Sequence, residues 1–371
     1  LGLALPQIQD GIDFVRAGGT VNVAAGFVYT GSLTITKSLN LLGNPSTLPV
    51  PFLPSAQHPY PAEQPGAASN APEIVATSGA AISVADPNSP VQVVIRGFKI
   101  TGNSNAAIDA FYSGGGNDPI AGSFIDISRN TITGGSPVMV RVHRFESVNV
   151  DYNLVRFANN KVFEISTAVD VNIRRNAVMA SEQPATGNDD IAFHLKDIRG
   201  TVNFLVNIID GSYPGLQNGQ PGLADGLVLT SSNATVYILN NYFSGLGNDA
   251  IRFESGDYIA SIHQNFIGAG VRTDLLTVLN EFSPRNLVGN RGDGIQLMAN
   301  AAGTFNIREN FIAGNATGPG AGSPFNLSID ISAGHPKTIN ESQNWYGTGN
   351  PINGVHYNWP GGAVTNPLQS G

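Results

Sequence analysis

Short runs in which apolar and polar residues alternate recur along most of the chain. Each unit has an alternating apolar strand, an asparagine, a second short apolar run, a turn rich in Gly and Asn, and a third alternating strand. Strict alternation predicts half-buried β-strands, because successive side chains on a strand point to opposite faces. Clear examples of the strand, asparagine and second run are residues 124–133, 171–179, 236–243, 259–267 and 305–312.

The units return at a nearly fixed interval. Aligned on the shared asparagine, they follow one another at a base period of 21 to 24 residues, with some steps lengthened to 31 or 34. Three strands at a rise of about 3.3 Å per residue, with short turns, use roughly that many residues. The period predicts a solenoid of three-stranded coils with insertions at permitted turns. The aligned residues are Asn130, Asn153, Asn176, Asn207, Asn241, Asn265, Asn286, Asn310 and Asn344, with Gly97 expected in the same place one coil earlier.

An asparagine in every coil has a structural explanation. Asparagine tolerates left-handed backbone, and its amide can bond the equivalent side chain in the coils above and below. We therefore expect an internal asparagine ladder rather than a row of sugar-binding residues.

The predicted fold is all-β, a right-handed parallel β-helix solenoid with a short N-terminal capping helix. Leucine-rich repeats have a similar period and an asparagine, but the fixed leucines of that repeat are missing and Ile, Val and Phe dominate the short runs. A β-sandwich would place antiparallel hairpin turns at less regular intervals. Both alternatives fit the pattern less well than the β-helix.

The N-terminal residues predict a cap for the first coil. Residues 5–16 have Ile8, Ile12 and Val15 on one helical face and are followed by Gly18 and Gly19. A cap is needed because an open coil end is an exposed sheet edge. The expected organisation is a cap helix in residues 1–18 and a β-helix in residues 19–371, with a proline-rich loop insertion at 45–72 and a closing segment at 344–371.

Both ends of the β-helix resemble known proteins. Residues 19–43 (GTVNVAAGFVYTGSLTITKSLNLLG) resemble the opening of bacterial right-handed β-helix repeat proteins of the pectin-lyase-like class. Residues 344–357 (NWYGTGNPINGVHY) resemble a terminal element of large bacterial surface proteins and adhesins of this architecture. With the repeats, the resemblance covers nearly the whole chain. It implies a fold rather than one activity, since the class mixes lyases, hydrolases, epimerases, phage tailspikes and non-catalytic surface proteins.

Composition narrows the setting. The 371 residues carry a net charge of −8 and only 19 Lys and Arg, which argues against a nucleic-acid partner. No run of 18 apolar residues is present, so we expect no membrane span. There is no cysteine, which excludes disulfides and thiol chemistry. The start at Leu1 fits a mature chain after signal removal, and we expect an extracellular or cell-surface protein.

Candidate chemistry lies on the third strand of the coils. Insertions are predicted at residues 181–187, 210–223, 268–274 and 313–324, and all but the last immediately precede these strands, so they are expected to rise as walls beside a groove. Four aspartates each stand two residues before an apolar position that is expected to point inward. The aspartates are Asp189, Asp225, Asp249 and Asp293, and the apolar residues are Ile191, Leu227, Ile251 and Ile295.

Period-two alternation then sends a polar strip outward. The resemblance implies that this sheet and its adjoining turn would carry any active site. Hydrolysis would need two carboxylates about 5 to 9.5 Å apart, whereas a lyase would need a base beside an Arg or Lys that neutralises a uronate. The catalytic candidates are Glu164, Asp189, Asp190, His194 and Glu254. The substrate-binding candidates are Arg141, His143, Lys196, Arg252 and Gln296, and Thr230 lies in the same strip.

Several observations favour a structural interpretation of these residues. Aspartate at a turn commonly satisfies backbone groups. The pair Asp189 and Asp190 resembles one motif of polygalacturonase-like hydrolases, but the Gly-His-Gly expected with it is missing. No metal triad is visible, and no cofactor is required, although aspartates and turn carbonyls suit Ca²⁺ as in pectate lyases.

Two hypotheses follow. The first is a rigid structural or adhesive module that binds polysaccharide or a cell-surface glycan, with self-association or binding to other matrix proteins as further options. The alternative is a polysaccharide-active lyase, hydrolase or epimerase that uses the strip. A phage tailspike would need a trimerising tail, which the sequence does not show.

Overall fold

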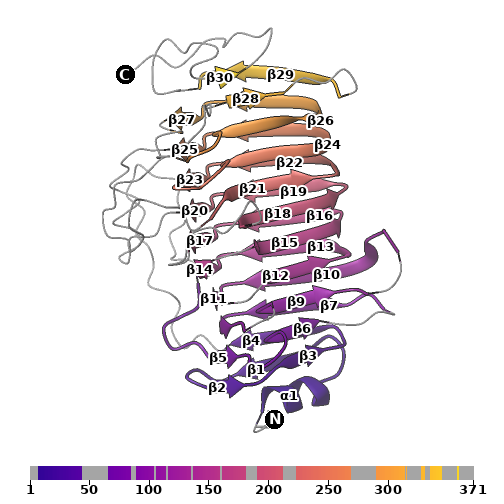
Figure 1. Cartoon of the computed structure of the whole chain (residues 1–371). Helices are drawn as coiled ribbons and strands as arrows, with labels where there is room; N and C mark the ends of the chain where they lie inside the picture. Colours follow the sequence, from indigo (N-terminus) through magenta and orange to yellow (C-terminus); the bar gives the residue numbers. More distant parts are fainter. Residues whose placement is uncertain are drawn as a thin grey trace.

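The chain forms a stack of coils with a short helix at its N-terminal end (Figure 1). The structure is a computed structural model that describes residues 7–43, 66–84, 89–103, 106–113, 116–134, 137–158, 161–180, 190–211, 223–268, 290–313, 315, 327–330, 335–344 and 357–358. Each coil contributes one strand to each of three faces, and strands of neighbouring coils pair in parallel. The predicted all-β parallel solenoid with a short N-terminal helix is confirmed.

We name the three faces by the strands that form them. The first face contains β3 (Leu33–Ile35), β6 (Ile82–Val84), β9 (Ile108–Phe111), β12 (Val138–His143), β15 (Lys161–Ala168), β18 (Ile191–Ile198), β21 (Asp225–Thr230), the N-terminal parts of β24 (Ile251–His263) and β26 (Ile295–Arg308), β28 (Leu327–Ile329) and β30 (Tyr357–Asn358). The second face contains β1 (Gly19–Val23), β4 (Leu39–Gly43), β7 (Gln92–Arg96), β10 (Ile120–Ser128), β13 (Phe145–Asp151), β16 (Asp170–Arg174), β19 (Thr201–Leu205), β22 (Ser232–Leu239), the C-terminal parts of β24 and β26, and β29 (Lys337–Ser342). The third face contains β2 (Val28–Thr30), β5 (Glu73–Val75), β8 (Lys99–Thr101), β11 (Thr131–Thr133), β14 (Leu154–Ala158), β17 (Ala177–Ala180), β20 (Ile208–Asp210), β23 (Tyr242–Ser244), β25 (Phe266–Gly268) and β27 (Phe311–Ala313).

The core runs along the axis of the stack. Alternate residues of every face point inward, so Ile, Val, Leu and Phe of one coil pack on the same types in the next. Aromatic rings also stack from coil to coil, with Phe163 and Phe193 4.8 Å apart and nearly parallel. Phe204 meets Phe193 edge to face and joins the second face to the first.

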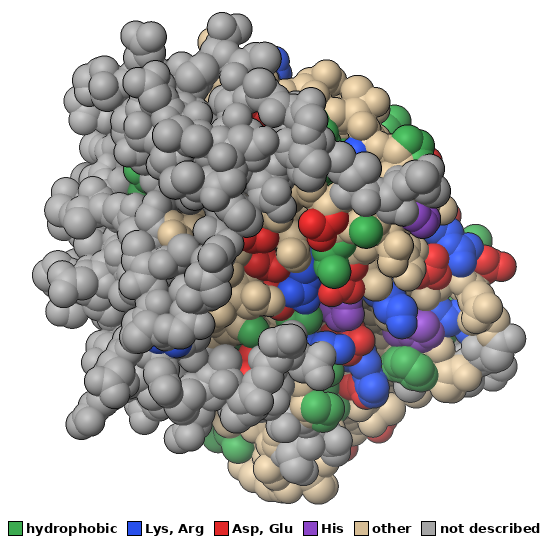
Figure 2. Space-filling view, turned by 45° about the horizontal axis from the view of Figure 1, so that its top comes forward, with side chains coloured by type: hydrophobic (Ala, Val, Ile, Leu, Met, Phe, Trp, Pro, Cys, Tyr) green, Lys and Arg blue, Asp and Glu red, His purple; other side chains and the backbone are tan. Residues whose placement is uncertain are grey.

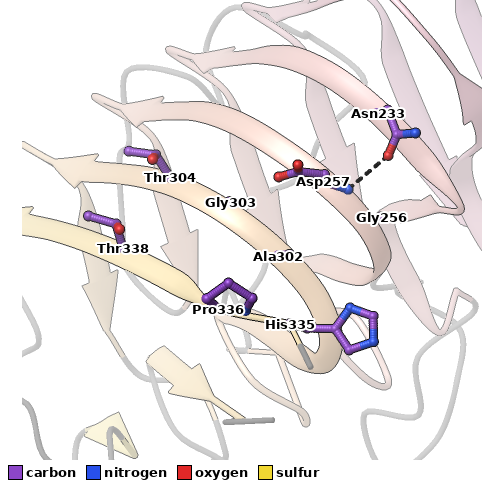
Figure 3. A pocket seen from close by; sticks show the side chains of 9 residues that line it. All are labelled: Asn233, Gly256, Asp257, Ala302, Gly303, Thr304, His335, Pro336 and Thr338. Carbon is purple, nitrogen blue, oxygen red and sulfur yellow. Dashed lines mark hydrogen bonds between the residues drawn. The ribbon is translucent and has the colours of Figure 1, made fainter. Parts of the chain in front are cut away.

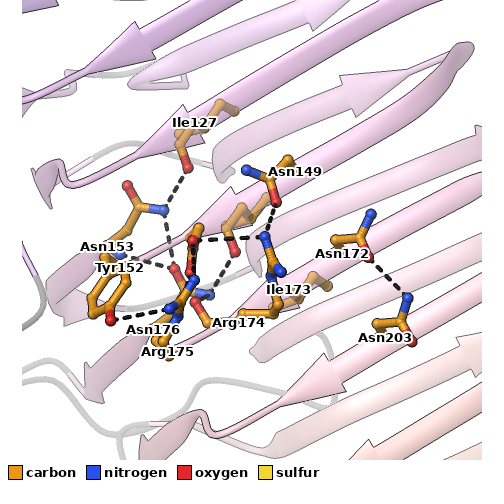
Figure 4. Close-up of polar contacts among 12 residues, drawn as sticks. Ile127, Asn149, Tyr152, Asn153, Asn172, Ile173, Arg174, Arg175, Asn176 and Asn203 are labelled. Atoms are coloured by element: carbon orange, nitrogen blue, oxygen red, sulfur yellow. Dashed lines mark hydrogen bonds and ion pairs between the residues drawn. The ribbon is translucent and has the colours of Figure 1, made fainter. Parts of the chain in front are cut away.

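Asparagine side chains form a buried ladder at the corner between the second and third faces (Figure 4). In each step the Oδ1 of one asparagine accepts the backbone N–H and the side-chain amide of the asparagine in the preceding coil. The order is Asn130, Asn153, Asn176, Asn207, Asn241, Asn265, Asn310 and Asn344. Asn265 bonds Asn310 directly, so Asn286, which lies outside the described residues, is not the step between them.

Two details of the predicted ladder were wrong. The backbone N–H that donates to Asn130 belongs to Phe98, so Phe98 rather than Gly97 holds the ladder position in the preceding coil. The left-handed residue is not the asparagine but the one before it, with φ between 55° and 58°. These left-handed residues are Arg129, Tyr152, Arg175, Val206, Asn240, Gln264, Glu309 and Gln343, and Gly97 precedes Phe98 in the same way.

The cap is shorter than its predicted range. The helix α1 spans Ile8–Phe14, and Ile8 and Ile12 are buried against the first coil. The Gln9 side chain bonds both the N–H and the C=O of Thr34, which are backbone groups of β3. The helix therefore covers apolar side chains and supplies partners to the strand edge at the end of the stack.

Most of the predicted insertions lie outside the described residues. This holds for residues 45–65 of the proline-rich loop, and residues 66–72 precede β5 without forming a strand. Residues 181–189, 212–222, 269–289 and 316–326 are also outside, and with them the predicted walls of the groove. In the closing segment, Asn344 ends the ladder and Tyr357–Asn358 pairs with β28.

Candidate functional site

Two rows of outward side chains run along the first face, and together we call them the polar strip. Residues paired across neighbouring coils point the same way, so the strand register fixes both rows. The alternating residues Ile191, Leu227, Ile251 and Ile295 are buried, as predicted. The first row is Asp109, Arg141, Glu164, His194, Val228, Arg252 and Gln296, and the second is Phe111, His143, Ser166, Lys196 and Thr230, continued by Glu254. Figure 2 shows side chains of both charges and histidines gathered on one part of the described surface.

A chain of polar contacts links His194 to Arg252 at the centre of the strip. His194 Nε2 lies 3.2 Å from Thr230 Oγ1, and the Thr230 hydroxyl donates to Glu254 Oε2 at 2.7 Å. Glu254 Oε1 in turn lies 3.0 Å from Arg252 Nη2. Since Thr230 gives its hydrogen to Glu254, it accepts from His194, which places the proton of the neutral imidazole on Nε2.

The surroundings of His194 keep the ring neutral. Burial lowers the pKa of His194 below its ordinary value, and the nearby ammonium group of Lys161 lowers it further. The other ring nitrogen, Nδ1, is buried and has no hydrogen bond within the described part of the chain. A general base must reach the proton that it removes, and the free lone pair of His194 does not reach the outer surface.

Arg252 lies in the outward row but turns its guanidinium back toward Asp225, the first residue of β21, and Asp249, which precedes β24. Only 11% of its side chain is exposed. It forms ion pairs with Asp225 at 3.1 Å, with Asp249 at 3.5 Å and with Glu254 at 3.0 Å. Arg252 therefore neutralises carboxylates of the protein, and its predicted role in substrate binding is not what this geometry favours.

The aspartates that precede the third strands form a second ladder. Asp225 Oδ1 accepts the backbone N–H of Asp249 at 3.0 Å, and Asp249 Oδ1 accepts that of Asp293 at 2.7 Å. Burial raises the pKa of Asp225 to about 7, although Arg252 acts in the opposite direction. Asp190 is 3% exposed, and Asp189 lies outside the described residues. Asp225 and Asp249 thus fasten one coil to the next.

The N-terminal end of the strip is a second cluster. Arg141 makes two hydrogen bonds to the Asp109 carboxylate, at 2.8 and 2.6 Å, and its guanidinium carbon lies 4.8 Å from the centre of the Phe111 ring. The Phe111 and His143 rings are stacked at 4.7 Å, and His143 Nδ1 lies 2.9 Å from Ser166 Oγ. Burial lowers the pKa of His143. The cluster is an aromatic and basic platform in which Asp109 fixes Arg141 and Ser166 holds the Nδ1 side of His143.

The carboxylates of the strip do not form an exposed catalytic pair. Glu164 on β15 and Glu254 on β24 are three coils apart, which is roughly 14 Å at about 4.8 Å per coil. This exceeds the 5 to 9.5 Å that glycoside hydrolysis needs. Asp225 and Glu254 both contact Arg252 and are close together, but Asp225 is completely buried. The remaining cations are Lys161, 3.8 Å from Glu164, and Lys196, which is exposed and forms no ion pair with the described residues.

One border of the strip was missed by the sequence analysis. The segment between β9 and β10 reaches along the corner between the first and second faces. There Arg199 donates hydrogen bonds to the Asp118 carboxylate and to the Asn117 carbonyl. Arg144 donates a further hydrogen bond to the Asp118 carbonyl. Arg199 follows β18, three coils further along the stack than β9. The Gly-rich stretch at residues 114–118 was the available signal.

Metal binding and membrane insertion receive no support within the described ranges. No group of three or more His, Asp or Glu side chains is arranged to hold a metal ion there. The helix found in those ranges, α1, has seven residues and is too short to cross a bilayer.

No family model matches the chain, and comparisons with curated proteins and with solved structures gave no significant match. Membership of the pectin-lyase-like class thus remains a resemblance in sequence, whereas the parallel β-solenoid is a property of the structure.

Proposed function

We propose that this protein is a non-catalytic extracellular or cell-surface rod that binds polysaccharide along the polar strip. The strip runs over seven consecutive coils, from β9 to β26, or roughly 29 Å at about 4.8 Å per coil. A row of this length, interrupted only by the buried Val228 among its described members, suits an extended chain of sugars better than a single small molecule.

The observation that carries this proposal is that neighbouring coils immobilise the groups that catalysis would need. Arg141 is held by Asp109, Arg252 by three carboxylates, and Glu254 by Thr230 and Arg252. The free nitrogen of His194 is buried. Fixed donors and acceptors bind a ligand with little loss of conformational freedom, whereas a proton-transfer catalyst needs a group that is free to change partners.

The resemblance to bacterial surface β-helix proteins of the pectin-lyase-like class supports the same proposal. The partner would be a polysaccharide or a cell-surface glycan, and a rod of stacked coils also suits self-association or attachment to other matrix proteins. Neither a metal nor a cofactor enters this proposal.

One observation favours the enzymatic alternative. His143 has a lowered pKa, so it is neutral and able to accept a proton at neutral pH, and it shares the second row with the exposed Lys196. A neutral base and a free cation on one face are the elements of uronate elimination or epimerisation. The second candidate is therefore a uronate lyase or epimerase rather than a hydrolase.

One experiment separates the two. The protein is mixed with a panel of neutral and acidic polysaccharides, binding is measured by affinity electrophoresis, and the same mixtures are assayed for new reducing ends and unsaturated uronates. We expect binding of an acidic polysaccharide without cleavage, and a weaker interaction in Lys196→Ala.

The matched control is Arg16→Ala, which removes an exposed cation between α1 and β1 at the N-terminal end of the stack, away from β18, and should leave binding unchanged. If the parent protein forms product and His143→Gln does not, the protein is a lyase and the non-catalytic proposal is wrong. Absence of binding to every polysaccharide, or equal weakening by both alanine variants, would overturn the proposal.

A further inference from the structure

The corner between the first and second faces changes shape near the C-terminal end of the stack. In earlier coils it passes through one left-handed residue, such as Arg144, Asp197 or Ser231. In β24 and β26 the strand continues through the corner, with Gly256 at φ 125° and Gly303 at φ 114°. Between the pairs Phe253–Leu297 and Ser255–Asn300, β26 also has one residue more than β24. The wider turn leaves a hollow beside it.

The hollow is a pocket of about 580 Å³ on the outer side of this corner (Figure 3). Its polar side chains come from four successive coils, and its floor is backbone of the two glycines. They are Asn233 of β22, Asp257 of β24, Thr304 of β26, His335 just before β29, and Thr338 of β29. A volume of this size is in the range of small-molecule sites, about 300 to 1,000 Å³.

Within the described residues, the polar side chains of the pocket make few hydrogen bonds to the protein itself. Within the described part of the chain, the hydrogen bond that their side chains make joins Asn233 Oδ1 to the backbone N–H of Asp257, at 3.1 Å. That bond fixes the Asn233 amide and leaves both of its N–H donors available. The Asp257 carboxylate and the Thr304 hydroxyl keep their full hydrogen-bonding capacity. The contrast with the polar strip, where neighbours hold most groups, points to a ligand.

The charges in the pocket restrict the ligand. The lining contains one carboxylate and no Lys or Arg. The adjacent Lys337 turns its ammonium group to the Ala299 carbonyl, 3.3 Å away. An anion would meet the Asp257 carboxylate with only the His335 imidazole in the lining and no Lys or Arg, and a divalent cation would find too few carboxylates. A neutral ligand with several hydroxyls can use amide, hydroxyl and carboxylate partners together.

Apolar surface lies immediately beside these polar groups. Ile259 is 60% exposed and pairs in register with Thr235 on one side and Thr304 on the other. Tyr237, 38% exposed, lies one coil earlier and pairs with Ser261. The structure identifies four large exposed hydrophobic side chains in its described part, and these are two of them. An exposed aromatic ring next to hydrogen-bonding groups suits the apolar face of a sugar ring.

We infer that this pocket and the adjoining residues Tyr237 and Ile259 form a binding site for a neutral oligosaccharide. One sugar occupies the pocket, with its hydroxyls on Asn233, Asp257 and Thr304, and the next lies over Ile259 and Tyr237. The site lies at the corner between the first and second faces and on the second face, whereas the polar strip lies on the first face, and it does not depend on the function proposed there. Two glycan sites on one rod would strengthen attachment to a surface through effective concentration.

The test uses maltohexaose, cellohexaose, mannohexaose and chitohexaose as neutral probes and hexagalacturonate as the acidic one. Binding is measured by calorimetry, and the Ile259 methyl resonance is followed by NMR in isoleucine-labelled protein. We expect one neutral probe to bind and to shift the Ile259 methyl. Asp257→Ala and Tyr237→Ala should each weaken binding of this probe about tenfold. The first variant loses one or two hydrogen bonds and the second loses a ring contact.

Thr304→Ala and Thr201→Ala form a matched pair, because both threonines lie in one outward column of the second face, three coils apart. The first should weaken binding and the second should not. Lys196→Ala should leave this site unchanged, which separates it from the polar strip. The inference fails if no neutral probe binds at millimolar concentration, if the Ile259 methyl stays in place on binding, if Thr201→Ala weakens binding equally, or if hexagalacturonate binds here as tightly.

Discussion

The side-chain oxygen of Asn176 accepts two hydrogen bonds from Asn153, one from the backbone N–H at 2.9 Å and one from the amide at 3.0 Å. Both residues are almost completely buried. The Asn176 amide also donates to the carbonyl of Val150 on the preceding coil. One side chain thus supplies partners to backbone groups that neither face of the corner would otherwise satisfy.

Loss of this side chain should weaken the stack at its middle. Asn176→Ala leaves the buried N–H of Asn153 without an acceptor, and we expect the free energy of unfolding to fall by about 2 to 3 kcal/mol. Guanidinium unfolding followed by circular dichroism measures the change. Asn172→Ala is the control, because Asn172 in the same coil points outward and bonds only the Asn203 amide. Its effect should be about 1 kcal/mol or less, and equal losses in the two variants would contradict the ladder's role.

Val206 is the β-branched residue among those held in left-handed backbone before the ladder asparagines, with φ 58°. Such a conformation costs an L-residue about 1 to 2 kcal/mol, and asparagine tolerates it best after glycine. Val206→Asn copies the neighbouring coil, where Asn240 has φ 57°. We expect the variant to be about 1 kcal/mol more stable in the same unfolding assay.

The control for this substitution is Val169→Asn. Val169 is also half-buried but has no left-handed backbone, so the same change there should bring no gain. A gain of the same size at Val169 would mean that the stabilisation at Val206 has another cause.

Gly256 should resist substitution because of the backbone beside it. A Cβ on Gly256 would lie 1.9 Å from the carbonyl oxygen of Ser232, and φ is 125°. Ser232 is fixed by its own place in β22, so the clash cannot be relieved by a side-chain movement. We expect Gly256→Ala to lower the free energy of unfolding by about 3 kcal/mol.

Gly26→Ala provides the comparison, since Gly26 has φ 70° with no atom within 4 Å of the added carbon. That variant should lose only the cost of left-handed backbone, about 1 to 2 kcal/mol. Similar melting temperatures for the two variants would show that the close approach to Ser232 is unimportant.

Much of the fold was predictable because every coil repeats the same alternation of apolar residues and the same corner asparagine. Alternation placed Leu227 and Ile251 inside, and the asparagine period placed Asn153 above Asn130. The failures concerned positions that no residue type marks. Phe98 has no side-chain amide to mark it, and only the hydrogen bond from its backbone N–H to Asn130 shows that it holds the ladder position. The left-handed residue has no sequence signature, since Arg, Tyr, Val, Asn, Gln and Glu all occupy it.

The chemistry of the strip was less predictable than its position. Alternation correctly sent Arg252 outward, but the direction of a long side chain depends on the charges within reach, and Asp225, Asp249 and Glu254 draw it back.

The pocket near Asp257 was invisible in the sequence for a related reason. It arises from a change in the number of residues at one corner, between β24 and β26, and not from a motif.

The buried Asp225 gives the protein a pH dependence that is opposite to that of an ordinary ion-paired carboxylate. Burial raises its pKa from 3.8 to about 7, so between these values the folded state binds more protons than the unfolded state. Stability then falls as pH rises through this window. Asp249, whose pKa burial also raises, acts in the same direction. Burial lowers the pKa of His194, so its contribution has the opposite sign near its ordinary value.

Asp225→Asn removes only the contribution of Asp225 to the pH dependence of stability, because the histidines and Asp249 are retained. Between about pH 4 and pH 7, we expect the unfolding midpoint of the parent protein to fall relative to that of the variant, by the equivalent of at most about 4 kcal/mol for a shift of three pKa units. The amide introduced by this substitution keeps an acceptor for the Asp249 N–H, so the ladder bond itself is preserved. Parallel pH profiles for the two proteins would show that Asp225 is ionised in the folded state throughout, with Arg252 outweighing the cost of burial.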